Sequence, residues 1–291
     1  MKVKNMNAPI GAEIADVDLS GKVDEITFQK IVSAFHARSV IVFRNQSLNT
    51  GQQIDFSRRF GDLDINVRSE FNKDSHPEVL VLSNIMKDGK PIGVQDAGRY
   101  WHTDLCYLTR PARATILHAL EVPMNGNESL GDTLFSSMTH AYDALPDNLK
   151  EKLSNLKAVQ SYKYTYEKKA RDFKLRPTLA VSGDSWIPGD VVHEAVRKHP
   201  YTGQKCLYVN EGYTTRLIGL PESESDALIQ FLISHASQPQ FQYAHKWRTG
   251  DFLMWDNCLV QHKATSDYKL PQRRLMERTT VLGSENIGIP A

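Results

Sequence analysis

Cysteine is scarce in this chain of 291 residues, which contains only Cys106, Cys206 and Cys258. Three cysteines, odd in number and far apart, do not indicate a disulfide framework or a cysteine-based zinc site. A dominant charge is also missing, because 35 lysines and arginines balance 34 aspartates and glutamates. Nucleic acid and anionic membranes attract proteins with a basic excess on one face, so the composition predicts neither partner.

Long apolar runs are absent as well. No stretch reaches the ~18 consecutive apolar residues of a membrane helix, and residues 1–7 lack the apolar core of a signal peptide. We therefore expect a cytoplasmic protein. A chain of this length without internal repeats can bury one sizeable core, so we expect a single domain over residues 1–291.

Hydrophobic periodicity predicts many short strands with helices between them. The predicted strands cover residues 10–19, 40–43, 79–83, 101–107, 115–122 and 273–282. Helical spacing predicts helices over 28–35, 50–60, 137–156 with a break at Pro146, and 223–235. This pattern favours a mainly β fold with helices, a double-stranded β-helix (jelly roll, cupin-like) core with supporting α-helices.

Residues 161–191 do not fit that alternation. The segment has mixed charge, two prolines and weak periodicity, which predicts a long loop. Loops of this length are usually either functional or disordered. We interpret the segment as a lid or insert over a substrate site, and a disordered excursion is the alternative.

The most specific chemical signal is the pair His102 and Asp104, with His262 far downstream. Residues two apart on a strand project to the same side, so His102 and Asp104 could hold one metal ion, and His262 could complete the set. Two histidines and one carboxylate suit a non-haem Fe(II) that also binds an organic chelator and O₂. The rival pair is His76 and Glu78, which reads as a loop before a strand.

Two arginines follow the last of these candidate ligands. Arg274 and Arg278 fall on one face of the predicted strand 273–282, about 13 Å apart at roughly 3.3 Å per residue. A guanidinium group can bind a carboxylate through two parallel hydrogen bonds. The pair could therefore hold a dicarboxylic co-substrate. The alternative is that both arginines decorate a solvated strand.

In their order along the chain, these motifs resemble those of the Fe(II)/2-oxoglutarate-dependent dioxygenases of the taurine dioxygenase (TauD/TfdA) type. The resemblance covers roughly residues 8–284 and is carried by Phe56-Ser57-Arg58-Arg59-Phe60-Gly61, Trp101-His102-Thr103-Asp104, Gly131-Asp132-Thr133, Ala141-Tyr142-Asp143-Ala144-Leu145, Val209-Asn210-Glu211-Gly212-Tyr213-Thr214, Trp255-Asp256-Asn257 and Arg274 with Arg278. It implies Fe(II) as cofactor, and 2-oxoglutarate and O₂ as co-substrates. The implied reaction hydroxylates a C–H bond while 2-oxoglutarate is decarboxylated to succinate and CO₂.

Position by position, the resemblance implies roles for individual residues. It implies that His102, Asp104 and His262 are the iron ligands. It implies that Arg274, together with the hydroxyl of Thr133, binds the distal carboxylate of 2-oxoglutarate. Together with Arg278, these five residues would make up the metal and co-substrate site.

The same resemblance implies residues for the primary substrate. Arg278 matches an arginine near the other carboxylate of 2-oxoglutarate or the anionic head of the substrate. Asn210 and Tyr213 match a segment that walls the substrate pocket in the taurine branch. That branch has a histidine and a tyrosine where this chain has Asn66 and Ser69. We therefore expect a small organic anion other than taurine, with Asn66 in its pocket.

The expected substrates are a sulfonate, a carboxylate or an aryloxyalkanoate, and taurine itself is the alternative. From a different class, a cupin-like metal-dependent hydrolase or a binding protein could use the same two histidines and carboxylate. The hydrolase would leave Arg274 and Arg278 unexplained, and a test for succinate formation from 2-oxoglutarate would separate the binding protein from an enzyme. The resemblance also implies a homo-oligomer, either a dimer or a tetramer.

Overall fold

The computed structural model describes residues 1–283, 289 and 290. A mixed sheet of eight strands forms its centre, in which β2 and β3 are parallel and the other neighbours are antiparallel. In spatial order the strands are β1 (Lys2–Asn5), β2 (Ala12–Ala15), β3 (Val40–Phe43), β18 (Phe252–Asp256), β8 (Ala112–Glu121), β20 (Leu275–Leu282), β5 (His76–Ser83) and β4 (Asn72–Lys73).

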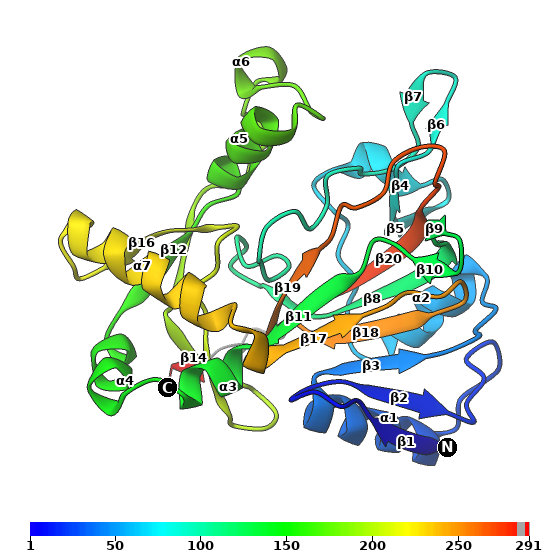
Figure 1. Cartoon of the computed structure of the whole chain (residues 1–291), viewed down its shortest axis with the longest axis horizontal. Coiled ribbons are helices and arrows are strands. Elements are labelled where there is room, and N and C mark those ends of the chain that lie inside the picture. Colours follow the sequence, from blue (N-terminus) through cyan, green and yellow to red (C-terminus); the bar gives the residue numbers. More distant parts are fainter. Residues whose placement is uncertain (284–288, 291) are drawn as a thin grey trace.

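A second sheet packs on one face of the first. Its antiparallel strands are β17 (Gln242–His245), β11 (Thr133–Ser137) and β19 (Val260–Ala264). Phe135 and Val260 from this sheet share a core with Leu117, Leu253 and Trp255 of the large sheet. The two sheets form the expected jelly roll, and Figure 1 shows β11 and β19 beside β8 and β20.

Strand β3 shows why some strands read as continuous apolar runs. Val40 and Val42 pack in the core between the two sheets. Ile41 and Phe43 point to the opposite face and pack against helical residues such as Phe35. Successive strand residues alternate between faces, so a strand that is buried on both sides must be apolar throughout.

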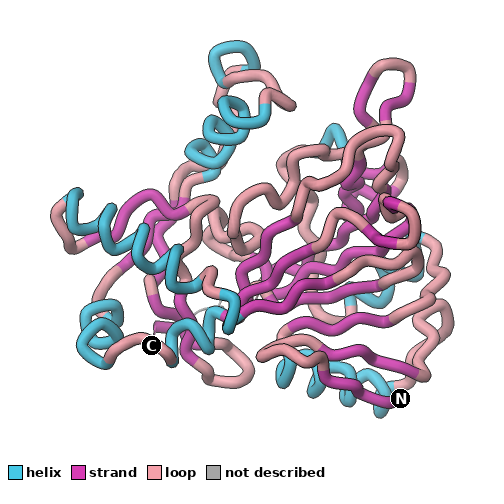
Figure 2. The backbone as a smooth tube through the Cα atoms, in the orientation of Figure 1, coloured by secondary structure: helices cyan, strands magenta, loops and turns pink. Residues whose placement is uncertain are grey.

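The helices lie around the periphery of the strands (Figure 2). They are α1 (Glu25–Arg38), α2 (Thr50–Arg58), α3 (Met138–Asp143), α4 (Asp147–Ser154), α5 (Tyr162–Phe173), α6 (Leu179–Ser182) and α7 (Glu222–Ala236), with short 3₁₀ turns η1 (Ser69–Phe71) and η2 (Pro239–Phe241). The predicted break at Pro146 is confirmed, because it separates α3 from α4. No helix in the described part of the chain combines the length and apolar character that crossing a membrane requires.

The remaining strands form smaller units. A third sheet joins β13 (Val191–Glu194), β12 (Lys157–Gln160) and β16 (Thr214–Ile218), and a fourth joins β15 (Lys205–Leu207), β14 (Val196–Lys198) and β21 (Ile289–Pro290). Two hairpins complete the chain, β6 (Met86–Lys87) with β7 (Lys90–Pro91) and β9 (Met124–Asn125) with β10 (Glu128–Ser129).

Three predicted segments differ from the structure. His76 and Glu78 lie within strand β5 and not in a loop before it. Residues 101–107 are not a strand: His102 makes a single bridge to His262, and a turn follows in which Leu105 has a left-handed φ of 52°. Their apolar character reflects burial in a core cluster that includes Tyr107 and Tyr162. Residues 161–191 are not a long loop, because they contain α5 and α6. The buried face of α5 includes Thr165 and Lys169, so its sequence lacks the apolar stripe by which a helix is usually predicted.

Candidate metal and co-substrate site

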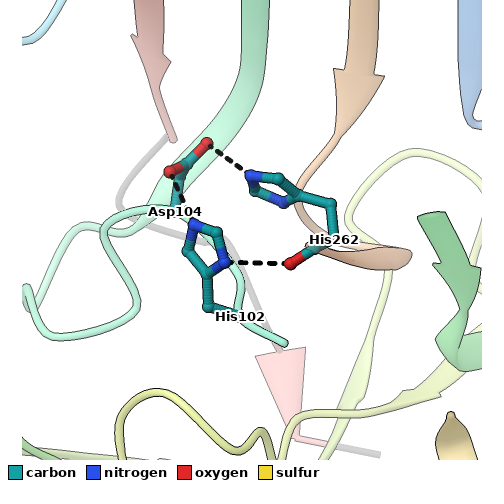
Figure 3. A group of neighbouring side chains, drawn as sticks. All are labelled: His102, Asp104 and His262. Atoms are coloured by element: carbon teal, nitrogen blue, oxygen red, sulfur yellow. Dashed lines mark hydrogen bonds and ion pairs between the residues drawn. The ribbon is translucent and has the colours of Figure 1, made fainter. Parts of the chain in front are cut away.

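The three predicted ligands converge from two separate segments of the chain. His102 and His262 form a backbone bridge, with N···O distances of 3.1 and 2.8 Å. The turn after His102 brings Asp104 back beside both rings (Figure 3). The Nε2 atom of His102 lies 3.7 Å from Oδ1 of Asp104, and Nε2 of His262 lies 3.7 Å from Oδ2. The ligating atoms of all three lie within 4.8 Å of one another.

This spacing fits a shared metal ion better than direct hydrogen bonds. Two atoms that each lie about 2.1 Å from one ion are separated by roughly 3 to 4 Å. The Nδ1 atom of His102 is within 2.9 Å of the backbone oxygens of Tyr100 and His262, which directs Nε2 toward Asp104. All three side chains are buried. The donor set is therefore preformed.

The protonation states also fit a metal site. Burial lowers the pKa of His262 well below its usual range, and the neighbouring His102 acts in the same direction. Burial alone would raise the pKa of Asp104, but Arg278, His262 and His102 together hold it below its usual range. A neutral imidazole and an ionised carboxylate are the forms that bind metal ions.

Three residues that hydrogen-bond around Asp104 fix its position, and the sequence motifs did not assign a role to any of them. The hydroxyl of Thr115 donates to Oδ2 of Asp104 at 2.7 Å. The side-chain amide of Asn257 donates to the same hydroxyl oxygen at 2.9 Å, and its Oδ1 accepts from the backbone N–H of Asp104 at 3.2 Å. The indole of Trp255 donates to that Oδ1 at 3.1 Å. The Trp255-Asp256-Asn257 motif therefore orients the carboxylate.

One cavity adjoins both predicted histidine ligands. It is lined by His102, Thr133, His262, Arg274 and Arg278, so five of the six residues predicted to bind metal and co-substrate meet there. Arg99, Trp255 and Tyr268 also line it, although no sequence pattern assigns these three residues to the site.

Arg274 is buried in this cavity without a carboxylate partner among the described residues. Its guanidinium lies 5.7 and 5.6 Å from the ring centroids of Trp247 and Tyr268, and donates to the backbone oxygen of Gly131. Gly131 has a φ of 76°, and a Cβ there would lie 2.2 Å from Nη1 of Arg274. Thr133 accepts a hydrogen bond from the indole of Trp247 at 3.0 Å, which leaves its hydroxyl free to donate.

Arg278 lies closer to the ligands. Its Nη1 is 3.3 Å from Oδ1 of Asp104, and its buried Nε has no hydrogen-bond partner in the part of the chain that the structure describes. Asp64 is near enough to Arg278 for the guanidinium to affect its pKa, although burial dominates and raises that pKa. Arg274 and Arg278 therefore line one cavity, with Arg278 at the end that holds the ligands.

Unlike Arg278, the other three residues predicted for the primary substrate do not lie in this cavity. Asn66 caps its own loop, since its Oδ1 accepts from the backbone of Arg68 at 2.9 Å. Asn210 is buried and accepts from the backbone of Tyr213 at 2.9 Å. None of Asn66, Asn210 and Tyr213 lines the cavity that contains Arg274. Tyr213 is nevertheless near the ligands, with its ring centroid 6.2 Å from that of His102.

A second group of possible ligands consists of His199, Asp256 and Cys258. The backbone N–H of Thr202 donates to Nδ1 of His199 at 2.9 Å, so Nε2 carries the proton and donates to Asp256 at 3.0 Å. Both ring nitrogens are thus already hydrogen-bonded. This group stabilises the turn after β18.

Comparison with known proteins agrees with this geometry. The family described as "Taurine catabolism dioxygenase TauD, TfdA family" matches residues 2–280. The chain belongs to this TauD/TfdA family. It is 30% identical to pentalenolactone F synthase of Streptomyces arenae, over 97% of this chain and 95% of that protein. It is 33% identical to the alpha-ketoglutarate-dependent 2,4-dichlorophenoxyacetate dioxygenase of Cupriavidus pinatubonensis, over 93% and 94% of the two chains.

Solved structures of family members have the same fold. A taurine dioxygenase from Burkholderia xenovorans superposes with a TM-score of 0.79 at 29% identity, covering 100% of this chain and 96% of that one. The expected jelly roll and the expected enzyme class, a 2-oxoglutarate-dependent dioxygenase, are therefore confirmed.

Proposed function

We propose that this TauD/TfdA dioxygenase hydroxylates a C–H bond of a small organic anion other than taurine, and that it converts 2-oxoglutarate and O₂ to succinate and CO₂ in the same reaction. The observation that carries the proposal is one cavity lined by His102 and His262 and by the buried guanidinium of Arg274, which has no carboxylate partner among the described residues. The related enzymes named for pentalenolactone and 2,4-dichlorophenoxyacetate support a substrate other than taurine.

We assign the metal to His102, Asp104 and His262. Fe(II) bound there would allow O₂ to be reduced while 2-oxoglutarate and the primary substrate are oxidised. Thr115 and Asn257 keep Asp104 in its ligating orientation, and the bridge between the two histidine backbones fixes their separation. The residues present therefore fit the ion that the family requires.

We assign the co-substrate to the rest of the cavity. Among the described residues, the guanidinium of Arg274 donates only to the backbone oxygen of Gly131, so its other N–H groups can donate to a ligand. The Thr133 hydroxyl can donate as well, so together they can bind the distal carboxylate of 2-oxoglutarate. The guanidinium of Arg278 stabilises negative charge close to the ligands. The rings of Trp255 and Tyr268 line the cavity, and the rings of Trp247 and Tyr268 lie close to Arg274, so this part of the site would have little contact with water.

We propose that residues 161–191, with α5 and α6, cover the primary substrate, and that Tyr213 walls its pocket. Asn66 and Asn210 would shape that pocket by holding backbone turns, since their side-chain oxygens are already hydrogen-bonded. A cytoplasmic location, a dimer or tetramer, and the lack of nucleic-acid partners stay predictions.

Succinate formation from 2-oxoglutarate, with Fe(II), ascorbate and O₂, tests the function. We expect phenoxyacetate, hexyl sulfate or hexane-1-sulfonate to stimulate succinate release, and taurine to have no effect. Stimulation by taurine alone would indicate a taurine dioxygenase. Conversion of the added organic anion to a hydrolysis product, without O₂ consumption or succinate release, would indicate a hydrolase. No turnover under any condition would indicate a binding protein.

A further inference from the structure

A lysine occupies the inward face of helix α5. The buried residues of this helix are Tyr162, Thr165, Tyr166, Lys169 and Ala170, which is the i, i+3, i+4, i+7, i+8 spacing of a face packed against the protein. Lys169 is 9% exposed. Lysine is rarely buried to this extent unless its ammonium group is paired with a negative charge.

Lys169 has no such partner. Among the described residues its ammonium makes no hydrogen bond or ion pair. The carboxylate that acts on it most strongly is Asp96, but Asp96 is already bound by both Nε and Nη2 of Arg176. Burial lowers the pKa of Lys169 to about 8, although Asp96 opposes the shift. Lys169 is thus a largely buried cation that pairs directly with no carboxylate of the described residues, which costs stability.

The uncompensated charge is close to the candidate iron site. Arg278 and Asp104 are both near enough to Lys169 to affect its pKa. Helix α5 is fixed beside the ligands by two hydrogen bonds. The hydroxyl of Tyr100 donates to Asp172 at 2.5 Å, and the hydroxyl of Thr165 donates to the backbone oxygen of Gly212. Tyr100 directly precedes the Trp101-His102 segment, so Lys169 is held in place relative to the ligands.

Aromatic rings connect this lysine-bearing face to His102. The ring of Tyr107 lies 4.7 Å from that of Tyr162 on α5 and 5.1 Å from that of Tyr213, whose ring is 6.2 Å from His102. The hydroxyls of these three tyrosines make no hydrogen bond with any described residue. They can therefore donate to a ligand, while the rings offer it an apolar surface.

We propose that Lys169 binds the anionic group of the primary substrate, and that this substrate is a carboxylate, sulfonate or sulfate ester carried on an apolar or aryl body that packs on Tyr107, Tyr162 and Tyr213. The proposal rests on the proposed function, because it names the substrate class for the same site. Lys169 suits this role better than Arg278, which already faces Asp104. Lys169 is a specificity-determining residue and takes no part in metal binding.

The first test measures stability without substrate. Replacing Lys169 by methionine removes the buried charge and keeps the length of the side chain, so Lys169→Met should raise the melting temperature of the unliganded protein. The control is Lys163→Met on the same helix, whose side chain is 50% exposed and 3.0 Å from Asp184. We expect this control to leave the melting temperature unchanged or slightly lower. A lower melting temperature for Lys169→Met would show a structural role and overturn the proposal.

The second test measures anion binding by calorimetry. The protein is loaded with Mn(II) and N-oxalylglycine, in which an NH group replaces one methylene of 2-oxoglutarate, so that no turnover occurs. Phenoxyacetate, hexyl sulfate and hexane-1-sulfonate are compared with the neutral phenoxyacetamide and 1-hexanol. We expect at least one anion to bind more tightly than its neutral analogue. Lys169→Met should weaken that binding at least tenfold, while Lys169→Arg and Lys163→Met should stay within threefold of the unmodified protein.

The outcomes separate this inference from the proposed function. Three results would overturn the role of Lys169. Lys169→Met could bind the anions as tightly as the unmodified protein does, or the unmodified protein could bind a neutral analogue as tightly as the matching anion. The third such result is that the unmodified protein binds none of the three anions. Anion-stimulated succinate release together with any of those results would leave the dioxygenase function standing. A different result would refute the metal and co-substrate assignment. In that case the unmodified protein would bind neither Mn(II) nor N-oxalylglycine, while its binding of the organic anions would still depend on Lys169.

Discussion

Arg274 offers the sharpest test of the co-substrate assignment. Its guanidinium is 7% exposed, lies close to two aromatic rings and faces no carboxylate among the described residues. Burial lowers its pKa, which means that the buried site disfavours the charged guanidinium while no anion is bound. The distal carboxylate of bound 2-oxoglutarate would supply the compensating negative charge. Arg274→Met should therefore act mainly on co-substrate affinity.

The expected size follows from losing one partner of a buried charge pair, about 2–5 kcal/mol. At roughly 1.4 kcal/mol per factor of ten, this is about a 30- to 4000-fold rise in the 2-oxoglutarate concentration needed for half-maximal rate. Arg274→Lys should fall between the two proteins, because an ammonium keeps the charge but loses the planar pair of donors.

The assay is the initial rate of succinate release as a function of 2-oxoglutarate concentration, with calorimetric titration of 2-oxoglutarate as a second measurement. The neighbour Arg273 provides the control. Its side chain is 55% exposed and 3.0 Å from Glu121, so Arg273→Met should leave the 2-oxoglutarate requirement unchanged. If Arg273→Met raised the requirement and Arg274→Met did not, the assignment of the clamp to Arg274 would be wrong.

Three further substitutions test the site and the fold. Asp104→Ala should abolish both turnover and stoichiometric Fe(II) binding, and retention of bound iron in metal analysis would refute its role as a ligand. Gly131→Ala should lower the melting temperature and raise the 2-oxoglutarate requirement, because its Cβ would collide with Arg274 at a φ of 76°; a variant like the unmodified protein in both would show that the guanidinium can shift. Burial, reinforced by Arg197, lowers the pKa of His193 to about 4, and its Nε2–H donates to the backbone of Leu108 at 3.0 Å. The neutral imidazole of His193 therefore becomes protonated at a higher pH in the unfolded chain than in the folded one. The free energy of unfolding should fall as pH drops from about 6.5 toward 4. His193→Gln should flatten that fall in urea-unfolding midpoints, and an unchanged slope would assign it to other groups.

Local sequence patterns determined much of the fold. The apolar run Val40–Phe43 is a strand buried on both faces, and Pro146 separates two helices as predicted. These features follow from periodicity and backbone chemistry within a few residues. Residues 101–107 show the limit of this reasoning. Their apolar side chains are buried by α5, which lies about 60 residues downstream, and no local pattern contains that contact.

The residue types of the candidate site were also readable from the sequence, whereas their arrangement was not. The sequence supplied two imidazoles, a carboxylate and two guanidinium groups in a recognisable order. The tertiary structure decided that His102 meets Asp104 through a turn and His262 through a single backbone bridge, and not along one strand. It also decided that Lys169 lies inside the protein and not on its surface, because burial depends on which distant segments cover a helix face, and sequence spacing shows only that the face exists.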